Sequence, residues 1–318
     1  MIRERFNGGE SELLQSRGHL AAWLAHASVE VLPRTLARIP HIDNLLPART
    51  RTYLAHIEGT EINDMVAAAK RLNDAGLTPM PHFPARLIRS QGEFRDWIAR
   101  YRDEAGVSEA LVLGGGVKDA RGPYESSMQL LETGLFDKMG FKRLHVAGHP
   151  EGNSDIDPDG SGRIATEALR WKHAFSERTE VQMAIVTQFV FEAAPVVRWA
   201  RAIREAGVSL PIHIGLAGPA KLATLIKYAV TCGVGPSLKV LQRRARDLTR
   251  LARPFEPTDI ASELATARAV HKDLQIEALH FFPLGGILPF IEWYDFHRSS
   301  AASEAVDPRS AHAASTPC

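Results

Sequence analysis

The sequence of 318 residues lacks both long apolar runs and an excess of charge of one sign. No stretch of about 18 or more residues is continuously apolar, so a membrane-spanning helix is not expected. The net charge of +1 at pH 7 gives no reason to expect a nucleic acid or a membrane surface as a partner. The opening residues carry mixed charge without an apolar core, which argues against a secretory signal peptide.

Cysteine is scarce, and no metal-ligand spacing occurs. The chain has two cysteines, Cys232 and Cys318, which are too few for a disulfide framework. This usage fits a reducing compartment and predicts a soluble, cytoplasmic protein. Asp155–Gly160 resembles the opening of a calcium loop, but Thr166 stands where that loop requires a bidentate glutamate. No bound metal is therefore expected.

Short apolar runs alternate along the chain with longer amphipathic segments, and hydrophobic residues make up 45% of the sequence. The short runs have the length and composition of buried strands. Eight are found: Ala27–Leu32, Thr52–Ile57, Thr78–Phe83, Ala110–Leu113, Arg143–Ala147, Gln182–Thr187, Pro211–Leu216 and Ile276–Phe281. Helical spacing marks Asn63–Ala75, Gln91–Glu104, Ser126–Met139, Thr166–Glu177, Ala193–Ala206, Ala220–Tyr228, Ser237–Arg250 and Thr258–His271.

Strands that alternate with helices imply parallel βαβ units, and eight such units predict a closed (β/α)8 TIM barrel. The barrel domain is expected over residues 26–298, with a closing helix that begins within Glu292–His297. Residues 1–25 are expected to form an N-terminal helical extension (helix Glu10–Leu24), and residues 299–318 a disordered polar tail. An open doubly wound sheet is the alternative. The number of strands and the lack of a glycine fingerprint after the first strand weigh against it.

Glu30 is the most conspicuous residue of the first predicted strand. Its neighbours Val29 and Val31 are apolar, so alternation along the strand places Glu30 inside the barrel, near the carboxyl end of the strand. A buried carboxylate is costly unless it is paired or functional, and active sites of such barrels lie at this end. Glu30 is therefore the candidate proton donor. The alternative is an interior ion pair with a basic residue of a neighbouring strand.

Other polar or glycine residues end predicted strands and would meet Glu30 at the barrel mouth. His82 and His149 end the third and fifth strands, and Gln188 closes the sixth with an amide that could bind a heterocycle. Gly114–Gly116 follows the fourth strand, where glycine lets backbone amides approach a ligand or simply makes a tight turn.

Several of these segments together resemble the methylenetetrahydrofolate reductase family. The resemblance runs from about residue 26 to residue 297 and covers the predicted barrel. Four segments carry it, in order along the chain: Ser28–Pro33 (SVEVLP), Ala147–Gly152 (AGHPEG), Ile185–Glu192 (IVTQFVFE) and Leu279–Leu284 (LHFFPL).

The resemblance implies reduction of 5,10-methylenetetrahydrofolate to 5-methyltetrahydrofolate by hydride from NAD(P)H, with Glu30 as general acid. It implies a folate substrate held by Gln188, Tyr228, Phe281 and Leu284. It implies a flavin, FAD, held by His82, Gly115, Gly116, Tyr124, His149 and Lys172. A homo-oligomer is compatible with it.

The chain departs from the family pattern on the flavin side. Where the family usually has Arg-Gly-Asp after the fourth strand, this chain has Gly114–Gly116, and His149 replaces a tyrosine. The hydride could therefore come through FAD or directly from NAD(P)H. Two other functions stay open: a folate-dependent one-carbon or methyl-handling barrel without net NADH oxidation, and a non-catalytic folate-binding barrel. The predicted strands contain no lysine, which disfavours a lyase or aldolase.

Overall fold

The computed structural model describes residues 18–231, residue 241 and residues 254–304, with side chains described up to residue 299. Apart from Leu241, the predicted helix Ser237–Arg250 lies outside these ranges, as do the first part of Glu10–Leu24 and the tail beyond Glu304. Residues 18–24 are helical, as the sequence predicts for this part of the extension.

Eight parallel strands close into a barrel in sequence order, so the predicted (β/α)8 TIM barrel is confirmed. Each strand pairs with the next, and β8 returns to β1 through the register Ser28↔His280 and Val29↔Phe281. The strands are β1 (Ser28–Val31), β2 (Arg51–Leu54), β3 (Thr78–Pro84), β4 (Glu109–Leu113), β5 (Arg143–Gly148), β6 (Gln182–Val190), β7 (Ile212–Ala217) and β8 (Ile276–Phe282).

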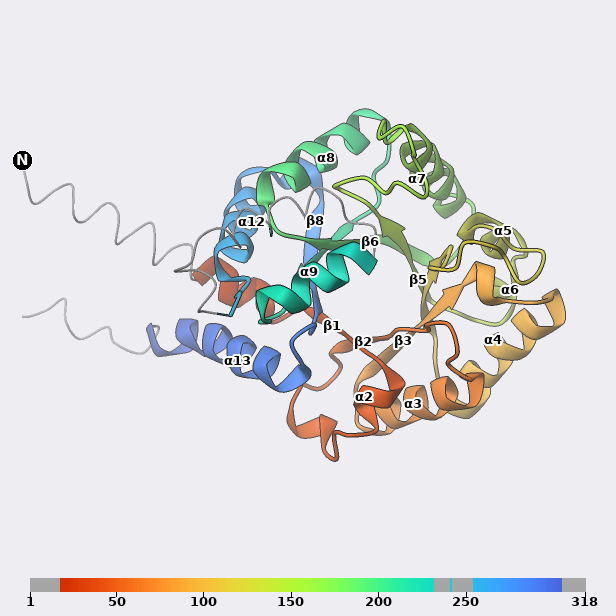
Figure 1. Cartoon of the computed structure of the whole chain (residues 1–318), viewed down its shortest axis with the longest axis horizontal. Helices are drawn as coiled ribbons and strands as arrows, with labels where there is room; N and C mark the ends of the chain where they lie inside the picture. Colours follow the sequence, from red (N-terminus) through yellow and green to blue (C-terminus); the bar gives the residue numbers. More distant parts are fainter. Residues whose placement is uncertain (1–17, 232–240, 242–253, 305–318) are drawn as a thin grey trace, which may run out of the picture.

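Most helices form a ring outside the strands (Figure 1). They are α2 (Pro33–Leu36), α3 (Ile62–Asp74), α4 (Gln91–Ala105), α5 (Ser127–Glu132), α6 (Leu135–Lys138), α7 (Arg163–Ser176), α8 (Ala193–Glu205), α9 (Leu222–Thr231), α12 (Thr258–Val270) and α13 (Ile287–Glu304). Short 3-10 turns occupy η1 (Ile42–Asn44), η2 (Ala85–Leu87) and η3 (Lys272–Leu274).

Two helices differ most from their predicted extents. The predicted helix Ser126–Met139 is two helices, because Gly134 takes a left-handed conformation with φ 62° between α5 and α6. The closing helix α13 begins at Ile287, earlier than predicted, directly after Gly286. It continues to Glu304, so residues 299–304, which the composition assigned to a disordered tail, are helical.

The two faces of the strands have different chemistry. Outward-facing residues such as Val29, Val31 and Leu279 join one large apolar cluster with the surrounding helices. The apolar cluster inside the barrel is small and centres on Tyr53, Met80, Leu111 and Val186. The hydrophobic stabilisation of the fold therefore comes mainly from the shell between strands and helices.

Helix α9 differs from its neighbours because it lies over the ring of strands (Figure 1). Its buried residues pack against Phe189, Ala217 and Phe282, which stand at the carboxyl ends of β6, β7 and β8. An isolated antiparallel bridge joins Ala220, just before α9, to Phe255. Part of the barrel mouth, the end where the strands finish, is thus covered by apolar side chains.

The opposite end, the barrel floor, is closed by ion pairs and by the helical residues 18–24. Arg51, the first residue of β2, makes an ion pair with Glu109 of β4, with Nε and Oε2 2.5 Å apart. Trp23 donates from its indole nitrogen to the carbonyl of Glu277 at 2.8 Å. Within the described residues, no helix combines the length and apolar character needed to cross a membrane.

Candidate functional site

Glu30 lies inside the barrel near its mouth, as the alternation of β1 predicts. Its side chain is 20% exposed and faces two imidazoles. Its Oε2 oxygen is 3.2 Å from Nε2 of His82 on β3 and 4.0 Å from Nε2 of His280 on β8. The His82 contact lacks the alignment of a hydrogen bond. Glu30 therefore sits between two imidazole nitrogens while part of the carboxyl remains open to the mouth.

A network of polar side chains continues below Glu30. His280 is 1% exposed, and its Nδ1 is 2.9 Å from the hydroxyl of Ser28. The ring of Tyr53 lies 4.3 Å from that of His280, and its hydroxyl is hydrogen-bonded to Nδ1 of His145. Both Tyr53 and His145 are fully buried. The barrel interior is thus filled with imidazole, phenol and hydroxyl groups at the level where aliphatic side chains are usual.

The network reaches the floor through His213 on β7. Its ring meets that of His145 edge to face, with centroids 4.6 Å apart. Its Nε2 lies 3.3 Å from Oε2 of Glu277, whose side chain is 54% exposed. Glu277 is the second residue of β8, next to a register irregularity between β7 and β8. This irregularity lets an otherwise outward position reach an inward histidine.

Burial favours the neutral form of three interior histidines. Desolvation is the main cause that lowers the pKa of His145 and His280 well below 6.5, and neighbouring positive or imidazole groups add to it. The pKa of His213 is also lowered by burial, while its contact with Glu277 opposes the shift. A neutral imidazole has one donor and one acceptor nitrogen, so each ring can donate one hydrogen bond and accept another.

Gln188 lies beside a bulge in β6, where the pairing with β7 shifts between Val186 and Phe189. The Thr187 hydroxyl accepts the backbone N–H of Gly215 at 2.8 Å and so replaces the missing ladder bond. A Cβ on Gly215 would clash with the carbonyl oxygen of Thr187, which explains the glycine. Bulges beside active sites re-aim side chains, and this one sets the direction of the half-buried Gln188.

The other residues assigned to substrate are not all in one place. Leu284 is half-buried and packs on the cluster under α9, and Tyr228 is 36% exposed on α9. Phe281 is fully buried outside the barrel, with its ring 5.1 Å from Phe290 of α13. The expected substrate contact by Phe281 is therefore wrong, because His280 takes the inward position and Phe281 the outward one.

Phe282 takes the inward place that was expected for Phe281. Its ring lies 4.6 Å from His280 and 5.7 Å from Phe189, and it is half-buried at the mouth. The other interior residues missed from the sequence carry the same signal that singled out Glu30. His145 stands between Leu144 and Val146, and the same flanking by aliphatic residues occurs at His213. A polar residue between two outward apolar ones marks the barrel interior.

The loop after β4 is braced by Arg86. The Gly114 carbonyl accepts the backbone N–H of Arg86 at 2.9 Å, and the Arg86 guanidinium donates to the carbonyls of Glu125 and Val117, each at 3.0 Å. Gly115 has φ +98°, and a Cβ there would be 3.1 Å from Cβ of Pro84. Gly115 is thus required by local packing, whereas no atom lies within 4 Å of a Cβ built on Gly116.

His149 and Lys172 form a second polar group beside β5. Lys172 is 7% exposed on α7, and burial lowers its pKa to about 8. Burial lowers the pKa of His149 to about 4, and the charge of Lys172 adds to this. Asp157 accepts the N–H groups of Ile164 and Ala165 at 2.7 and 3.0 Å, so it caps the start of α7.

Tyr124, the remaining residue assigned to flavin, packs into the outer shell. It is 7% exposed and its ring lies 5.9 Å from that of Phe94. Among the described side chains, no group of three or more His, Cys, Asp or Glu residues is arranged to hold a metal ion.

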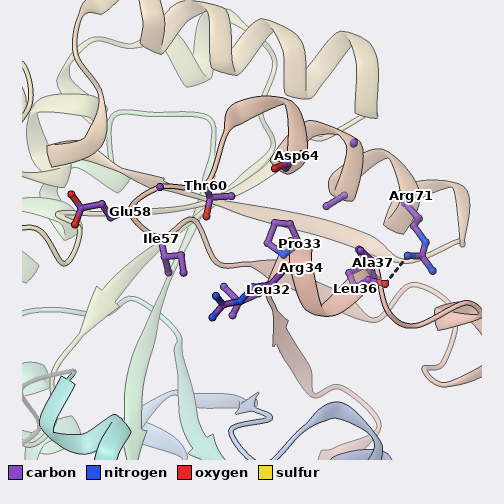
Figure 2. A pocket seen from close by; sticks show the side chains of 13 residues that line it. Leu32, Pro33, Arg34, Leu36, Ala37, Ile57, Glu58, Thr60, Asp64 and Arg71 are labelled. Atoms are coloured by element: carbon purple, nitrogen blue, oxygen red, sulfur yellow. Dashed lines mark hydrogen bonds between the residues drawn. The ribbon is translucent and has the colours of Figure 1, made fainter.

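A groove of about 520 Å³ opens beside the mouth, between the segments that follow β1 and β2. Figure 2 shows Leu32 and Ile57 on its inner side and Arg71 at its far end, where the guanidinium reaches the carbonyl of Leu36 at 2.6 Å. Glu30 does not line this groove. The groove therefore adjoins the site and is not the place where Glu30 acts.

Comparison with solved structures shows the barrel fold. No protein-family model matches the chain. A structure of an uncharacterised protein from Clostridium thermocellum, described as binding two copies of 5-methyl-5,6,7,8-tetrahydrofolic acid, has a TM-score of 0.52 and 12% identity over 85% of this chain and 94% of that chain.

Two enzymes are similar at lower scores. The tryptophan synthase α-subunit from Pyrococcus furiosus has a TM-score of 0.45 and 8% identity, over 88% of this chain and 98% of that chain. Dihydropteroate synthase from Thermus thermophilus has a TM-score of 0.43 and 12% identity, over 89% of this chain and 94% of that chain.

Proposed function

We propose that this chain is a folate enzyme that reduces 5,10-methylenetetrahydrofolate to 5-methyltetrahydrofolate with NAD(P)H. The observation that carries the proposal is the Glu30 carboxyl, held inside a closed barrel at its mouth between the Nε2 atoms of His82 and His280. Active sites of (β/α)8 barrels lie at this end. The folate bound by the Clostridium thermocellum barrel supports folate as the ligand class.

Glu30 would donate the proton that opens the folate ring. Protonation of N10 breaks the five-membered ring and leaves an iminium at N5, which accepts the hydride. Proton transfer by a positioned acid contributes roughly 10²- to 10⁴-fold to such reactions. The partly open carboxyl can reach a ligand at the mouth, and the flanking imidazoles hold its position.

Gln188 and the aromatic and apolar side chains at the mouth would bind the pterin. The amide of Gln188 offers a donor and an acceptor to the edge of a heterocycle. Phe282 and Leu284 present apolar surface at the mouth, where they pack on the cluster under α9. Stacking and orientation are the tasks left to the protein when a dinucleotide supplies the hydride.

The hydride donor in this proposal is NAD(P)H, used directly or through FAD. Lys172 is a buried ammonium whose burial lowers its pKa to about 8, and a bound phosphate would offset this cost. Lys172 and the open backbone at Gly116 would hold a dinucleotide phosphate. A flavin ring has less support, because Tyr124 is packed against Phe94.

Two measurements on the purified protein test the proposal. NADH oxidation that depends on methylenetetrahydrofolate, with 5-methyltetrahydrofolate as product, is the expected result. Tight folate binding without NADH oxidation would overturn it in favour of a one-carbon-handling barrel. The absorbance spectrum separates the two routes for hydride: flavin bands indicate FAD, whereas a colourless and active protein establishes direct transfer.

A further inference from the structure

The polar side chains inside the barrel form a column from the mouth to the floor. Most of them are buried, and they come from β1, β2, β5, β7 and β8. We propose that this column conducts protons from solvent at the floor to Glu30 at the mouth. Its members, in order from the floor, are Glu277, His213, His145, Tyr53, Ser28, His280 and Glu30.

The upper half of the column is closely connected. Nε2 of His280 lies 4.0 Å from Oε2 of Glu30, and an approach of about 1 Å would give a normal hydrogen bond. Nδ1 of the same ring lies 2.9 Å from the Ser28 hydroxyl. Burial raises the pKa of the Tyr53 hydroxyl, and the nearby Ser28 hydroxyl opposes this shift. The Tyr53 hydroxyl in turn bonds Nδ1 of His145.

The lower half contains two nitrogens without a hydrogen-bond partner, one on each of two neighbouring imidazole rings. Nε2 of His145 and Nδ1 of His213 are both buried without a hydrogen-bond partner, and their rings lie 4.6 Å apart. The other nitrogen of each ring is already used, by Tyr53 and by Glu277. A direct bond or one water between these two nitrogens would complete the column, and buried polar atoms normally find such a partner.

Glu277 gives the column an outlet to solvent at the floor. Its carboxyl is 3.3 Å from Nε2 of His213, and 54% of its side chain is exposed. Glu30 lies at the other end, where a bound ligand would cover it. Once Glu30 has given its proton to such a ligand, the floor offers a route for a new proton that does not cross the ligand.

The proton transfer along the column leaves no intermediate group with an added or a missing proton. A proton taken up by Glu277 passes to Nε2 of His213, and the proton on Nδ1 of that ring passes to Nε2 of His145. Nδ1–H of His145 passes its proton to Tyr53, Tyr53 to Ser28, and Ser28 to Nδ1 of His280. The proton on Nε2 of His280 then restores the Glu30 acid. Each intermediate group gains one proton and loses one, and it must return to its first tautomer between transfers.

Buried neutral imidazoles suit this task. A histidine that held its proton firmly would stop the chain as a fixed cation, whereas desolvation keeps His145 and His280 uncharged. The competing explanation is that the same residues only fill and hold together the barrel interior. The two explanations differ in what happens when one hydroxyl or one distant carboxyl is removed without changing the shape of the interior.

Two variants interrupt the column with little change of shape. Tyr53→Phe removes the hydroxyl between Ser28 and His145 and keeps the ring that packs on His280. Glu277→Gln changes a half-exposed group at the floor, far along the barrel from Glu30. Glu180→Gln is the matched control, because Glu180 is exposed at the same end, just before β6.

The first readout needs no activity. The measurement is the rate at which the ring N–H protons of His145 and His280 exchange with D₂O. This rate is followed by ¹⁵N-resolved NMR. A proton path predicts exchange that slows by about tenfold or more at His280 in Tyr53→Phe and at both histidines in Glu277→Gln, and not in Glu180→Gln, at equal thermal stability. Unchanged exchange in both column variants would overturn the path, whether or not the protein reduces folate.

The second readout rests on the proposed function. In steady-state NADH oxidation with methylenetetrahydrofolate, the two column variants should lower kcat by about 10- to 100-fold, with a larger solvent isotope effect and little change in KM for folate. A fall in melting temperature without a change in kcat or isotope effect would assign the column a structural role. Absence of NADH oxidation in the wild type would count against the proposed function alone, since the exchange measurement still decides the path.

Discussion

Nε2 of His82 faces Oε2 of Glu30 at 3.2 Å across the mouth of the barrel, without the alignment of a hydrogen bond. The two side chains come from β1 and β3, with strand β2 between these strands, so the contact depends on barrel closure and not on local sequence. A carboxyl with one loose partner can turn toward a ligand more easily than one held in a strong ion pair. This distinguishes Glu30 from the tightly paired Glu109 at the floor.

Glu30→Gln should lower kcat for folate-dependent NADH oxidation by roughly 10²- to 10⁴-fold, because the amide cannot donate the required proton. Affinity for 5-methyltetrahydrofolate, measured by calorimetry, should stay within about twofold. Glu58→Gln is the control, because Glu58 lies at the rim, 59% exposed, in an ion pair with Arg121. Loss of folate binding in a folded Glu30→Gln protein would mean that Glu30 positions the ligand.

Gly215→Ala should destabilise the protein and disturb Gln188 together. The new Cβ would clash with the carbonyl oxygen of Thr187 and lie 2.8 Å from that of Gln188, so the bulge must move. Overpacking of this kind costs about 1–3 kcal/mol, measurable by urea unfolding. Gly92→Ala in the first turn of α4, whose nearest atom is the Ser90 hydroxyl at 3.7 Å, should not lose stability. Equal stability of the two variants would contradict the packing argument.

Lys172 should make the unliganded protein more stable as pH rises. Its folded-state pKa is lowered to about 8 from 10.5, so between these values the unfolded chain binds more protons than the folded one. Stability should therefore increase by about 2 kcal/mol from about pH 7 to about pH 9.5.

Lys172→Met should abolish this increase, whereas Lys70→Met, at an exposed ammonium paired with Asp74, should keep it. Chemical denaturation at several pH values makes the comparison. A rise of the same size in Lys172→Met would mean that another group titrates.

Acid should destabilise the protein well before its carboxylates are protonated. The buried His56, His145, His213 and His280 and the half-buried His149 all have lowered pKa values, chiefly through desolvation. Near pH 6.5 the histidines of the unfolded chain bind protons, whereas these histidines in the folded chain do not. The free energy of unfolding is therefore highest above this pH and falls below it.

His56→Phe isolates one of these contributions. Phenylalanine can keep the stack on Trp97, where the ring centroids are 4.8 Å apart, and it cannot titrate. Between about pH 6.5 and 5, the slope of unfolding free energy against pH should fall by about 1 kcal/mol per pH unit. The exposed His41→Phe should leave the slope unchanged. A slope that His56→Phe does not alter would contradict the lowered pKa of His56.

Alternation along the strands made the barrel and the position of Glu30 predictable. Val29 and Val31 mark the outward face of β1, and the same pattern at His145 and His213 would have found two further interior residues. The pairing of those residues across the barrel could not be predicted, because it depends on the relative heights of strands that are distant in sequence. Phe281 was misassigned because a matching motif does not state which of two adjacent phenylalanines faces inward.

Irregular backbone conformations were the other feature that could not be predicted from the sequence. The bulge at Thr187 and Gln188 and the left-handed Gly134 each change the structure through one residue. Hydrophobic periodicity averages over a longer window, so a single such residue inside an apolar or helical pattern does not alter it. Gly134 therefore went unnoticed within the predicted helix Ser126–Met139.

Because the shell is apolar and the interior polar, substitutions on the two faces of the strands should have different effects. Outward residues of the strands carry most of the buried apolar surface, whereas inward ones such as Ser28, His213 and His280 contribute hydrogen bonds and proton-exchanging groups. Under the proposed function, substitutions on the inward face would alter the reaction, while those on the outward face would alter folding and leave the chemistry alone. New activities are reached most easily through the inward positions, one strand at a time.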